Sequence, residues 1–350
     1  IERAKIIYEY VQNKTRYINV VIGIGGWQPM EADEVDRLGY GDCKALTFYT
    51  KSLMDVAEVP SIYTIVFAGD QKENIKKDIV SLQGNHVFLC LPQKKDTIWL
   101  ECTSQKVPFG YKNSFTDDRD VLAITPDGGK IVHTSYYKDE ENIQRTVATY
   151  SLLENAEIQG SASIKSYGTQ YMHHLSSFDG LQPKDLDKKM KNYLSFINNL
   201  SFSKIEVKNN KEKKRYEENI KFAAENYAII NQDASLIFKP NILNRNSYIP
   251  NRERNRQMPF KIMRGYKDMD EYTIIIPKNY QLSIVPKAIN IENRFGKYSV
   301  TIEKLSDHSL KYTRQLIINR GNYSKELYEK YRRFRKRIKK LDNLKLLLTK

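Results

Sequence analysis

Cysteines and long hydrophobic runs are scarce in this sequence, and each scarcity excludes a class of protein. The chain has three cysteines in 350 residues, at positions 43, 90 and 102. Three cysteines cannot form a disulfide scaffold, and their spacing matches no paired CxxC zinc pattern. No stretch approaches the roughly 18 consecutive apolar residues that a membrane-spanning helix requires. No cluster of histidines and carboxylates has metal-ligand spacing either, so we predict no metal site.

The first residues predict a helix that begins a piece of a longer or processed chain. The sequence does not start with Met, and residues 1–13 place Ala4, Ile7, Tyr8 and Val11 on one helical face. Any signal peptide would then lie outside these residues. The length of 350 residues predicts two or three domains, and 24 Tyr and 13 Phe spread along the chain argue against global disorder.

The charge of the chain is unevenly distributed. The formal net charge is +15, but residues 1–150 hold 18 basic and 21 acidic side chains, whereas residues 151–350 hold 39 and 21. We therefore expect two parts with different roles. A solvated basic surface is favoured over nucleic-acid binding, because no zinc finger, glycine-aromatic RNA motif or clear helix-turn-helix is present.

Much of the basic excess falls in a predicted C-terminal helix, from about residue 324 to 341, followed by the strand candidate LKLLL. Its apolar residues form one narrow stripe: Leu327, Tyr331, Phe334, Ile338 and Leu341. The basic residues lie between them: Lys330, Arg332, Arg333, Arg335, Lys336, Arg337, Lys339 and Lys340. This basic face is either solvated surface or a means of peripheral attachment to an anionic membrane surface or acidic partner.

The order of predicted elements indicates an α+β protein with a catalytic core followed by a β-rich part. A helix at about 42–57 precedes strands at 61–68, 86–91 and 97–103, which is a helix against an antiparallel sheet. Long strands dominate from about residue 143, interrupted by a helical segment at 168–199. We place the domains at 1–137 (core), 138–322 (β-rich, with the helical insertion) and 323–350 (basic helix and short strand).

Cys43 has the surroundings of a reactive cysteine. It follows the glycine-rich segment GYGD and stands in the first turn of the predicted helix, where unpaired N–H groups and the helix dipole favour a thiolate. Gly39 and Gly41 are expected to let this loop pass close to a substrate. Asp42 is expected to cap the helix.

Two neighbouring strands supply the partners that a nucleophilic cysteine needs. His86 opens one strand and Glu101 lies on the next, which is the order of a Cys-His-acid triad. If paired positions sum to an odd number, His86 and Glu101 share one face of the hairpin. Cys90 and Cys102 then lie on opposite faces and cannot form a disulfide. Asp96, in the turn, is a weaker candidate for the acid.

Three ordered motifs resemble the transglutaminase-like superfamily, cysteine enzymes of papain-like fold. They are GYGDCK at the helix start, NHV on a strand and WLECTS on the next strand, and the resemblance covers about residues 1–137. The remainder resembles the β-rich C-terminal domain that follows this core in large exported bacterial proteins, where a further β-rich domain precedes it. The resemblance implies a papain-like core and a β-rich, sandwich-like second domain.

Carried over residue by residue, the resemblance makes Cys43 the nucleophile and His86 its histidine, with Glu101 in the place of the usual Asp. The extra methylene of Glu changes its reach by roughly 1.5 Å. The oxyanion hole would use the backbone N–H of Cys43 and one upstream donor, for which Trp27 and Gln28 are the candidates. This chemistry needs no cofactor.

The function expected from this pattern is thiol-dependent acyl transfer through a thioester, as a cysteine protease, amidase or acyltransferase. The partners would be a peptide or protein substrate and proteins of the cell envelope, with no nucleic acid. The resemblance implies an exported, periplasmic or envelope-associated location. The alternative is a catalytically silent scaffold or binding subunit of an envelope complex, which the Glu in place of Asp and the long β-rich domain leave open.

Overall fold

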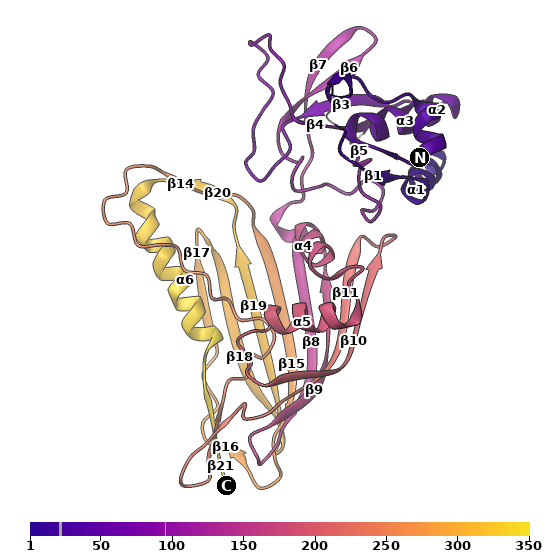
Figure 1. Ribbon diagram of the computed structural model, residues 1–350. Coiled ribbons are helices and arrows are strands. Elements are labelled where there is room, and N and C mark those ends of the chain that lie inside the picture. The colour runs from indigo at the N-terminus through magenta and orange to yellow at the C-terminus, as the bar shows by residue number, and fades with distance from the viewer. Residues whose placement is uncertain (21–22, 95) are drawn as a thin grey trace. The chain divides into compact units, whose positions relative to one another are not determined.

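The computed structural model describes residues 1–20, 23–94 and 96–350 and has an α+β fold rich in mixed and antiparallel sheet (Figure 1). The chain divides into two compact units. Unit 1 comprises residues 1–137 with 211–214, and unit 2 comprises residues 138–210 and 215–350. Within the described residues, no helix combines the length and the apolar character needed to cross a bilayer.

Unit 1 is a small antiparallel sheet with the order β5-β4-β3-β6-β7, together with three helices. Its elements are α1 (Glu2–Lys14), β1 (Arg16–Tyr17), η1 (Gly23–Gly26), α2 (Ala32–Leu38), β2 (Tyr40–Gly41), α3 (Cys43–Val56), β3 (Ile62–Val66), β4 (His86–Leu91), β5 (Ile98–Leu100), β6 (Asp120–Thr125) and β7 (Gly128–His133).

Helix α3 packs against strand β4, and its sequence explains why. Its apolar residues recur at helical spacing, so Leu46, Tyr49 and Met54 are buried together in the core of unit 1. The hydroxyl of Thr47 donates to the backbone oxygen of Val87 at 3.3 Å, which ties the helix to the strand. The predicted helix against an antiparallel sheet is confirmed.

The β4–β5 hairpin has the predicted odd register, since Leu89 faces Leu100 and Cys90 faces Trp99. One face contributes Leu89, Leu100 and Cys102 to the aliphatic cluster under α3, and the other packs Phe88, Cys90 and Trp99 together. All three cysteines are free thiols. Cys90 and Cys102 therefore lie on opposite faces without a disulfide, as predicted.

Unit 1 also contains elements whose sequences give little periodic signal. Helix α2 lies within the stretch 17–41, and strands β6 and β7 lie within 105–137. Both are short. Helix α2 has seven residues, of which Val35 alone is buried, so its apolar period is too brief to detect.

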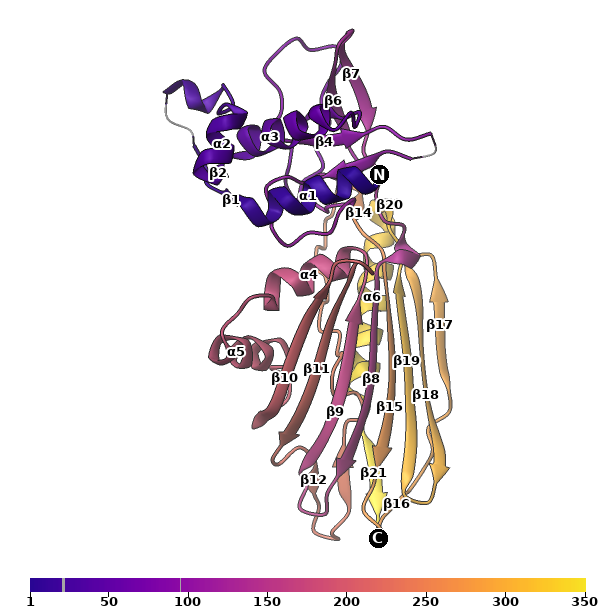
Figure 2. The same cartoon turned by 90° about the vertical axis from the view of Figure 1, so that its right-hand side faces the viewer.

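Unit 2 is built on one eight-stranded sheet with the order β10-β11-β9-β8-β15-β19-β18-β17 (Figure 2). Only its β8–β15 pair is parallel. Its elements are η2 (Asp139–Glu141), β8 (Ile143–Leu152), β9 (Ile158–Ser166), α4 (Thr169–Phe178), α5 (Pro183–Tyr193), β10 (Leu200–Asn210), β11 (Arg215–Ala224), β12 (Ile229–Ile230), β13 (Leu236–Phe238), β14 (Phe260–Ile262), β15 (Tyr266–Ile275), β16 (Gln281–Leu282), β17 (Ile289–Asn293), β18 (Gly296–Ser306), β19 (Ser309–Ile318), β20 (Gly321–Tyr323), η3 (Lys325–Leu327), α6 (Tyr328–Asp342) and β21 (Leu346–Thr349).

The expected sandwich-like arrangement needs correction. Alternate residues of β8, β15 and β19 are buried, so one face of the large sheet is covered. Helices α4, α5 and α6 and the segment from residue 239 to 259 contribute to this cover, and the second sheet has only four short strands, β12-β13-β21-β16. The helices thus take the place that a full second sheet has in a sandwich.

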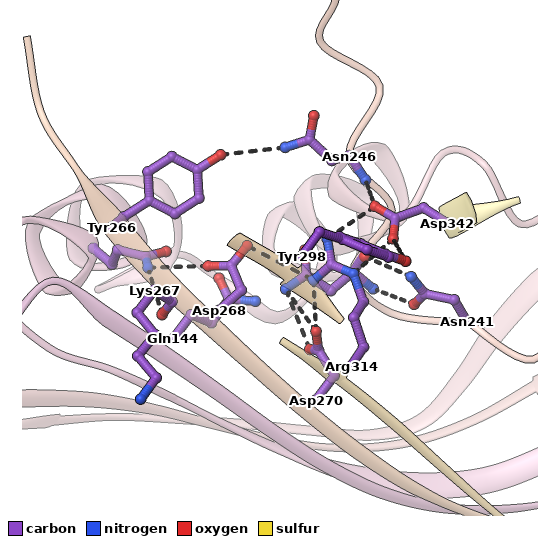
Figure 3. A network of polar contacts seen from close by, with 12 residues as sticks. Gln144, Asn241, Asn246, Tyr266, Lys267, Asp268, Asp270, Tyr298, Arg314 and Asp342 are labelled. Carbon is purple, nitrogen blue, oxygen red and sulfur yellow. Dashed lines mark hydrogen bonds and ion pairs between the residues drawn. The ribbon is translucent and has the colours of Figure 1, made fainter. Parts of the chain in front are cut away.

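Helix α6 lies along the sheet and is anchored by a buried network of charges (Figures 1 and 3). The guanidinium of Arg314 donates to both carboxylate oxygens of Asp342, at 2.6 and 2.8 Å, and to Asp270 at 2.7 Å. The hydroxyl of Tyr298 also donates to Asp342. All three charged side chains have no exposed surface.

The narrow apolar stripe predicted for this helix is largely confirmed. For one charged residue, Arg335, the position predicted from helical periodicity is wrong. Tyr331, Phe334, Ile338 and Leu341 are buried, whereas Leu327 is only partly so. Arg335, expected on the basic outer face, is 3% exposed. It donates to Asn246 and Tyr266 and lies over the ring of Tyr248, contacts from distant segments that helical periodicity cannot reveal.

The Arg314→Met variant tests the importance of this network. Because Asp270 and Asp342 would remain buried without their cation, we expect the free energy of unfolding to fall by about 3–5 kcal/mol. Urea denaturation followed by circular dichroism measures it. The control is Lys311→Met on the same strand, whose ion pair with Glu271 is exposed, and a change within about 0.5 kcal/mol is expected there. Equal losses in the two variants would contradict the anchoring role of Arg314.

Candidate active site

Cys43 is the first residue of α3, and the local sequence explains why the helix starts there. The Asp42 carboxylate accepts a hydrogen bond from the backbone N–H of Ala45 at 3.0 Å, the predicted N-cap, and pairs with Lys44. Gly39 has φ +69° at the end of α2, and a Cβ on Gly41 would lie 2.8 Å from that of Ala45. Both glycines are therefore favoured by the local fold.

The structure brings His86 and Glu101 together. Nε2 of His86 lies 2.9 Å from Oε2 of Glu101, whose side chain is only 3% exposed. The other carboxylate oxygen accepts hydrogen bonds from the backbone N–H and the hydroxyl of Thr103. Continuing the β4–β5 register would set Glu101 opposite Phe88, diagonal to His86. The longer side chain of Glu suits this diagonal separation.

The side chain of Cys43 lies close enough to His86 to be one of the groups that raise the pKa of its imidazole. Because Nε2 faces Glu101, Nδ1 is the ring nitrogen left for the sulfur. The ring of Phe115 lies 5.7 Å from the imidazole, centroid to centroid, and helps to enclose it. The three residues predicted from the sequence therefore lie near one another, with a hydrogen bond between His86 and Glu101.

The electrostatics of this cluster favour a charged histidine. Burial lowers the pKa of His86, but the Glu101 carboxylate and the Cys43 side chain outweigh it and raise the pKa to about 10. Burial raises the pKa of Glu101, yet His86 and Thr103 more than offset this effect and hold it below its usual value. At neutral pH, the imidazole and the carboxylate form a buried ion pair.

The two other cysteines have environments that disfavour ionisation. Burial raises the pKa of the Cys90 thiol to about 11. For Cys102, burial is again the largest cause and the pKa rises to about 12. Both side chains are buried in the core, whereas Cys43 is partly exposed. Cys43 is therefore the thiol placed for chemistry.

The remaining candidates lie outside this cluster. The backbone N–H groups of Trp27 and Gln28 both donate to the oxygen of Ile24, and Trp27 is 72% exposed. Gln28 instead lines a pocket of about 280 Å³ beside the start of α3, with Asp42 and Ala45. The side chain of Asp96 is 64% exposed in its turn, so Glu101 is the carboxylate beside His86.

Two residues near the site carried no assignment from the sequence. Thr103 orients Glu101, and its place in the WLECTS motif was a usable signal. Tyr17 is brought close by parallel pairing of β1 with β2, in which it faces Gly41. Burial and then Cys43 raise the pKa of its hydroxyl. No local pattern marks Tyr17, because a two-residue strand has no detectable period.

No described group of three or more His, Cys, Asp or Glu side chains could hold a metal ion. The cluster of Cys43, His86 and Glu101 has the composition for nucleophilic chemistry at a carbonyl.

Comparisons with known proteins agree with an α+β, β-rich fold. Residues 234–348 match the family DUF3858, a domain of unknown function with a solved structure. The whole chain is similar to a crystal structure described as a "putative protease" from Parabacteroides distasonis, with 12% sequence identity and a TM-score of 0.52. The match covers 100% of this chain and 52% of that one, so the chain spans about half its length. No curated protein matches. At this identity the likeness shows the fold alone.

The Glu101→Gln variant should lower the pKa of His86 from about 10 to near or below 6.5. The neutral amide cannot stabilise the imidazolium by charge, while burial still favours the neutral ring. NMR titration of the His86 ring measures the change. Asp96→Asn is the matched control, because it removes an exposed carboxylate from the same hairpin and should leave the titration unchanged. If Asp96→Asn shifts the pKa of His86 and Glu101→Gln does not, the pairing of His86 with Glu101 is contradicted.

The same pair should make stability depend on pH. Because the pKa of His86 is raised on folding, its contribution is complete below about pH 6.5 and is lost as the pH rises through about 10. The contribution of Glu101, whose pKa is lowered from 4.5, is complete above that pH and is lost on further acidification. The stability difference between wild type and Glu101→Gln should therefore be largest between these limits.

Proposed function

We propose that this chain is a thiol-dependent acyl-transfer enzyme of the transglutaminase-like superfamily, acting on peptide or carboxamide carbonyls. The observation that carries the proposal is the hydrogen bond from His86 to the buried Glu101, with Cys43 near the same imidazole at the start of α3. Residues 1–137 would be the catalytic, papain-like core. The fold likeness to a solved protein described as a protease supports peptide hydrolysis as the first reaction to test.

In the proposed reaction, the Cys43 thiolate attacks the carbonyl carbon and forms a tetrahedral intermediate. The intermediate collapses as the C–N bond breaks, and the leaving amine takes the proton from the His86 imidazolium. The now neutral His86 accepts a proton from water, or from an amine acceptor, as that nucleophile attacks the thioester. Sγ leaves as thiolate, which returns the thiolate and the imidazolium to their starting state. Glu101 orients the ring and stabilises its charge throughout.

The proposed oxyanion donors are the backbone N–H of Cys43 and the side-chain amide of Gln28. The first N–H groups of a helix lack partners within the helix and point beyond its N-terminus, where a developing negative charge is stabilised. Since the backbone N–H groups of Trp27 and Gln28 are engaged by Ile24, the Gln28 side chain is the better placed of the original candidates.

The rival function is a silent scaffold or binding subunit of a cell-envelope complex. A scaffold has no need of Glu101, because burying a carboxylate costs free energy that a neutral residue would avoid. Here the buried carboxylate is held on three sides, by His86 and by two groups of Thr103. A buried carboxylate that is held in place to orient and charge one histidine supports catalysis. Export to the periplasm or cell envelope, with peptide or protein substrates, belongs to the same proposal.

Selective alkylation at pH 6 tests the proposal without knowledge of the substrate. We expect iodoacetamide to modify Cys43 at least about tenfold faster than Cys90 or Cys102, because an imidazolium and a helix N-terminus stabilise a thiolate. Peptide mass spectrometry of the native protein locates the label. His86→Gln should remove the difference in rate, and Glu101→Gln should reduce it less.

Unfolding in urea provides the control, since all three thiols should then react at similar rates. If native Cys43 reacts no faster than the buried cysteines, the hypothesis of a thiol enzyme is rejected in favour of the scaffold hypothesis. Once a peptide or amide substrate is found, Cys43→Ala should abolish turnover while leaving the fold intact.

We further propose that the basic face of α6 makes peripheral contact with anionic membrane surfaces. Arg333, Lys336 and Lys340 are exposed, while the apolar stripe of the helix is buried in the interior of unit 2. A helix whose apolar residues are already buried cannot insert, so the contact would be electrostatic.

Co-sedimentation with vesicles containing phosphatidylserine tests this contact. We expect binding that weakens steeply with salt and is lost when Arg333, Lys336 and Lys340 are all changed to Glu. The control changes three exposed lysines of α5, Lys184, Lys188 and Lys189, to Glu and keeps the same net charge. No binding at low salt, or equal loss in both variants, would leave the basic face as ordinary solvated surface.

A further inference from the structure

A pocket of about 320 Å³ lies in unit 2 and is lined in part by strands β12 and β13 of the small sheet. Four separate chain segments supply its walls: the loop after α5, the connection from β11 to β12, strand β13 with the residues that follow it, and the link between α6 and β21. Its lining residues include three cations, and no carboxylate stands among those that the structure describes. A pocket with uncompensated positive charge is suited to an anion.

Arg245 is held rigidly at this pocket by neutral partners. Nε donates to the backbone oxygen of Asn241 at 2.5 Å, and Nη2 donates to the hydroxyl of Tyr227 at 2.5 Å. The guanidinium also lies over the ring of Phe196, 4.9 Å from its centroid. These contacts fix its position without neutralising its charge. A guanidinium has five N–H donors, so donors remain for a further partner.

Lys239 and Lys345 bring two more positive charges to the same place. Nζ of Lys239 donates to the side-chain oxygen of Asn343 at 3.0 Å. Burial lowers the pKa of Lys239, and the nearby charges of Arg245 and Lys345 lower it further. Across the described parts of the chain, no Asp or Glu forms an ion pair with any of the three cations. Their mutual repulsion would be relieved by a bound anion.

The rest of the pocket is apolar or carries uncharged amides. Phe196, Ile229 and Ile237 form apolar walls, and Ile229 is 53% exposed. The side chains of Asn198 and Asn226 add polar groups to the lining. A ligand that fits must therefore combine a multiply charged anionic group with an apolar portion.

We propose that this pocket binds a phosphate monoester with a small apolar portion. Its phosphate carries a charge of about −1.5 to −2 at neutral pH and has three acceptor oxygens, which match the donors of Lys239, Arg245 and Lys345. The apolar portion lies against Phe196 and Ile229. This function goes beyond the proposed acyl transfer, because the pocket and its ligand belong to unit 2.

Isothermal titration calorimetry with phenyl phosphate tests the proposal on the full chain. Saturable binding is expected, tighter than that of inorganic phosphate or of benzoate, which has the ring with a single negative charge. Lys345→Gln and Lys239→Gln should each weaken binding about tenfold, as the loss of a charged hydrogen bond does. Lys330→Gln is the matched control: it is exposed on α6, about 18 Å along the helix from its C-terminal end, and should leave affinity unchanged.

Absence of saturable binding to the folded wild-type protein at millimolar phenyl phosphate would overturn the proposal. Equal affinity for benzoate, or unchanged affinity in both pocket variants, would do so too. A second arm replaces phenyl phosphate with vesicles that contain phosphatidate, a phosphomonoester lipid. Binding to the soluble ester alone assigns a soluble ligand, and binding to both, lost in Lys345→Gln, assigns a lipid headgroup.

Discussion

The register of β4 against β5 is the constraint on which the candidate site depends. Side chains alternate between the two faces of a strand, so an odd pairing sum places Leu89, Leu100 and Cys102 under α3. The same parity leaves His86 and Glu101 together on the other face. A slip of β5 by one residue would move Glu101 to the aliphatic face, away from His86, and would turn Leu100 to the opposite face. The hydrophobic core and the pairing of His86 with Glu101 are thus selected by one geometric condition.

This condition also explains how Glu101 reaches His86, at a position where the sequence resemblance leads us to expect Asp. The pairing sets Glu101 diagonal to His86 instead of directly opposite, and the additional methylene spans the extra separation. The backbone N–H and the hydroxyl of Thr103 donate to the second carboxylate oxygen of Glu101. Both oxygens of the buried carboxylate therefore have hydrogen-bond partners. Thr103, Glu101 and His86 thus form a connected network in which each group orients the next, and Cys43 lies near the histidine.

In unit 2, buried charge has a structural role. Arg314 joins Asp270 on β15 to Asp342 at the end of α6, and this contact holds the helix on the sheet (Figure 3). Lys345 follows only three residues after Asp342, so the same anchor positions one of the three cations of the proposed anion pocket. The exposed basic face of α6 depends on it as well, because the helix can present one side only when the other is packed.

The sequence by itself determined the helix that carries Cys43, the strands on either side of the hairpin turn and the parity of their pairing. It could do so because capping, helical period and strand alternation are local properties. It also marked Cys43, His86 and Glu101, through residue type and order. Only the tertiary structure decided that Arg335 is buried, that Tyr17 lies near the thiol and that Lys239, Arg245 and Lys345 converge. Each of these depends on contacts between segments far apart in the chain, which leave no period or spacing in the sequence.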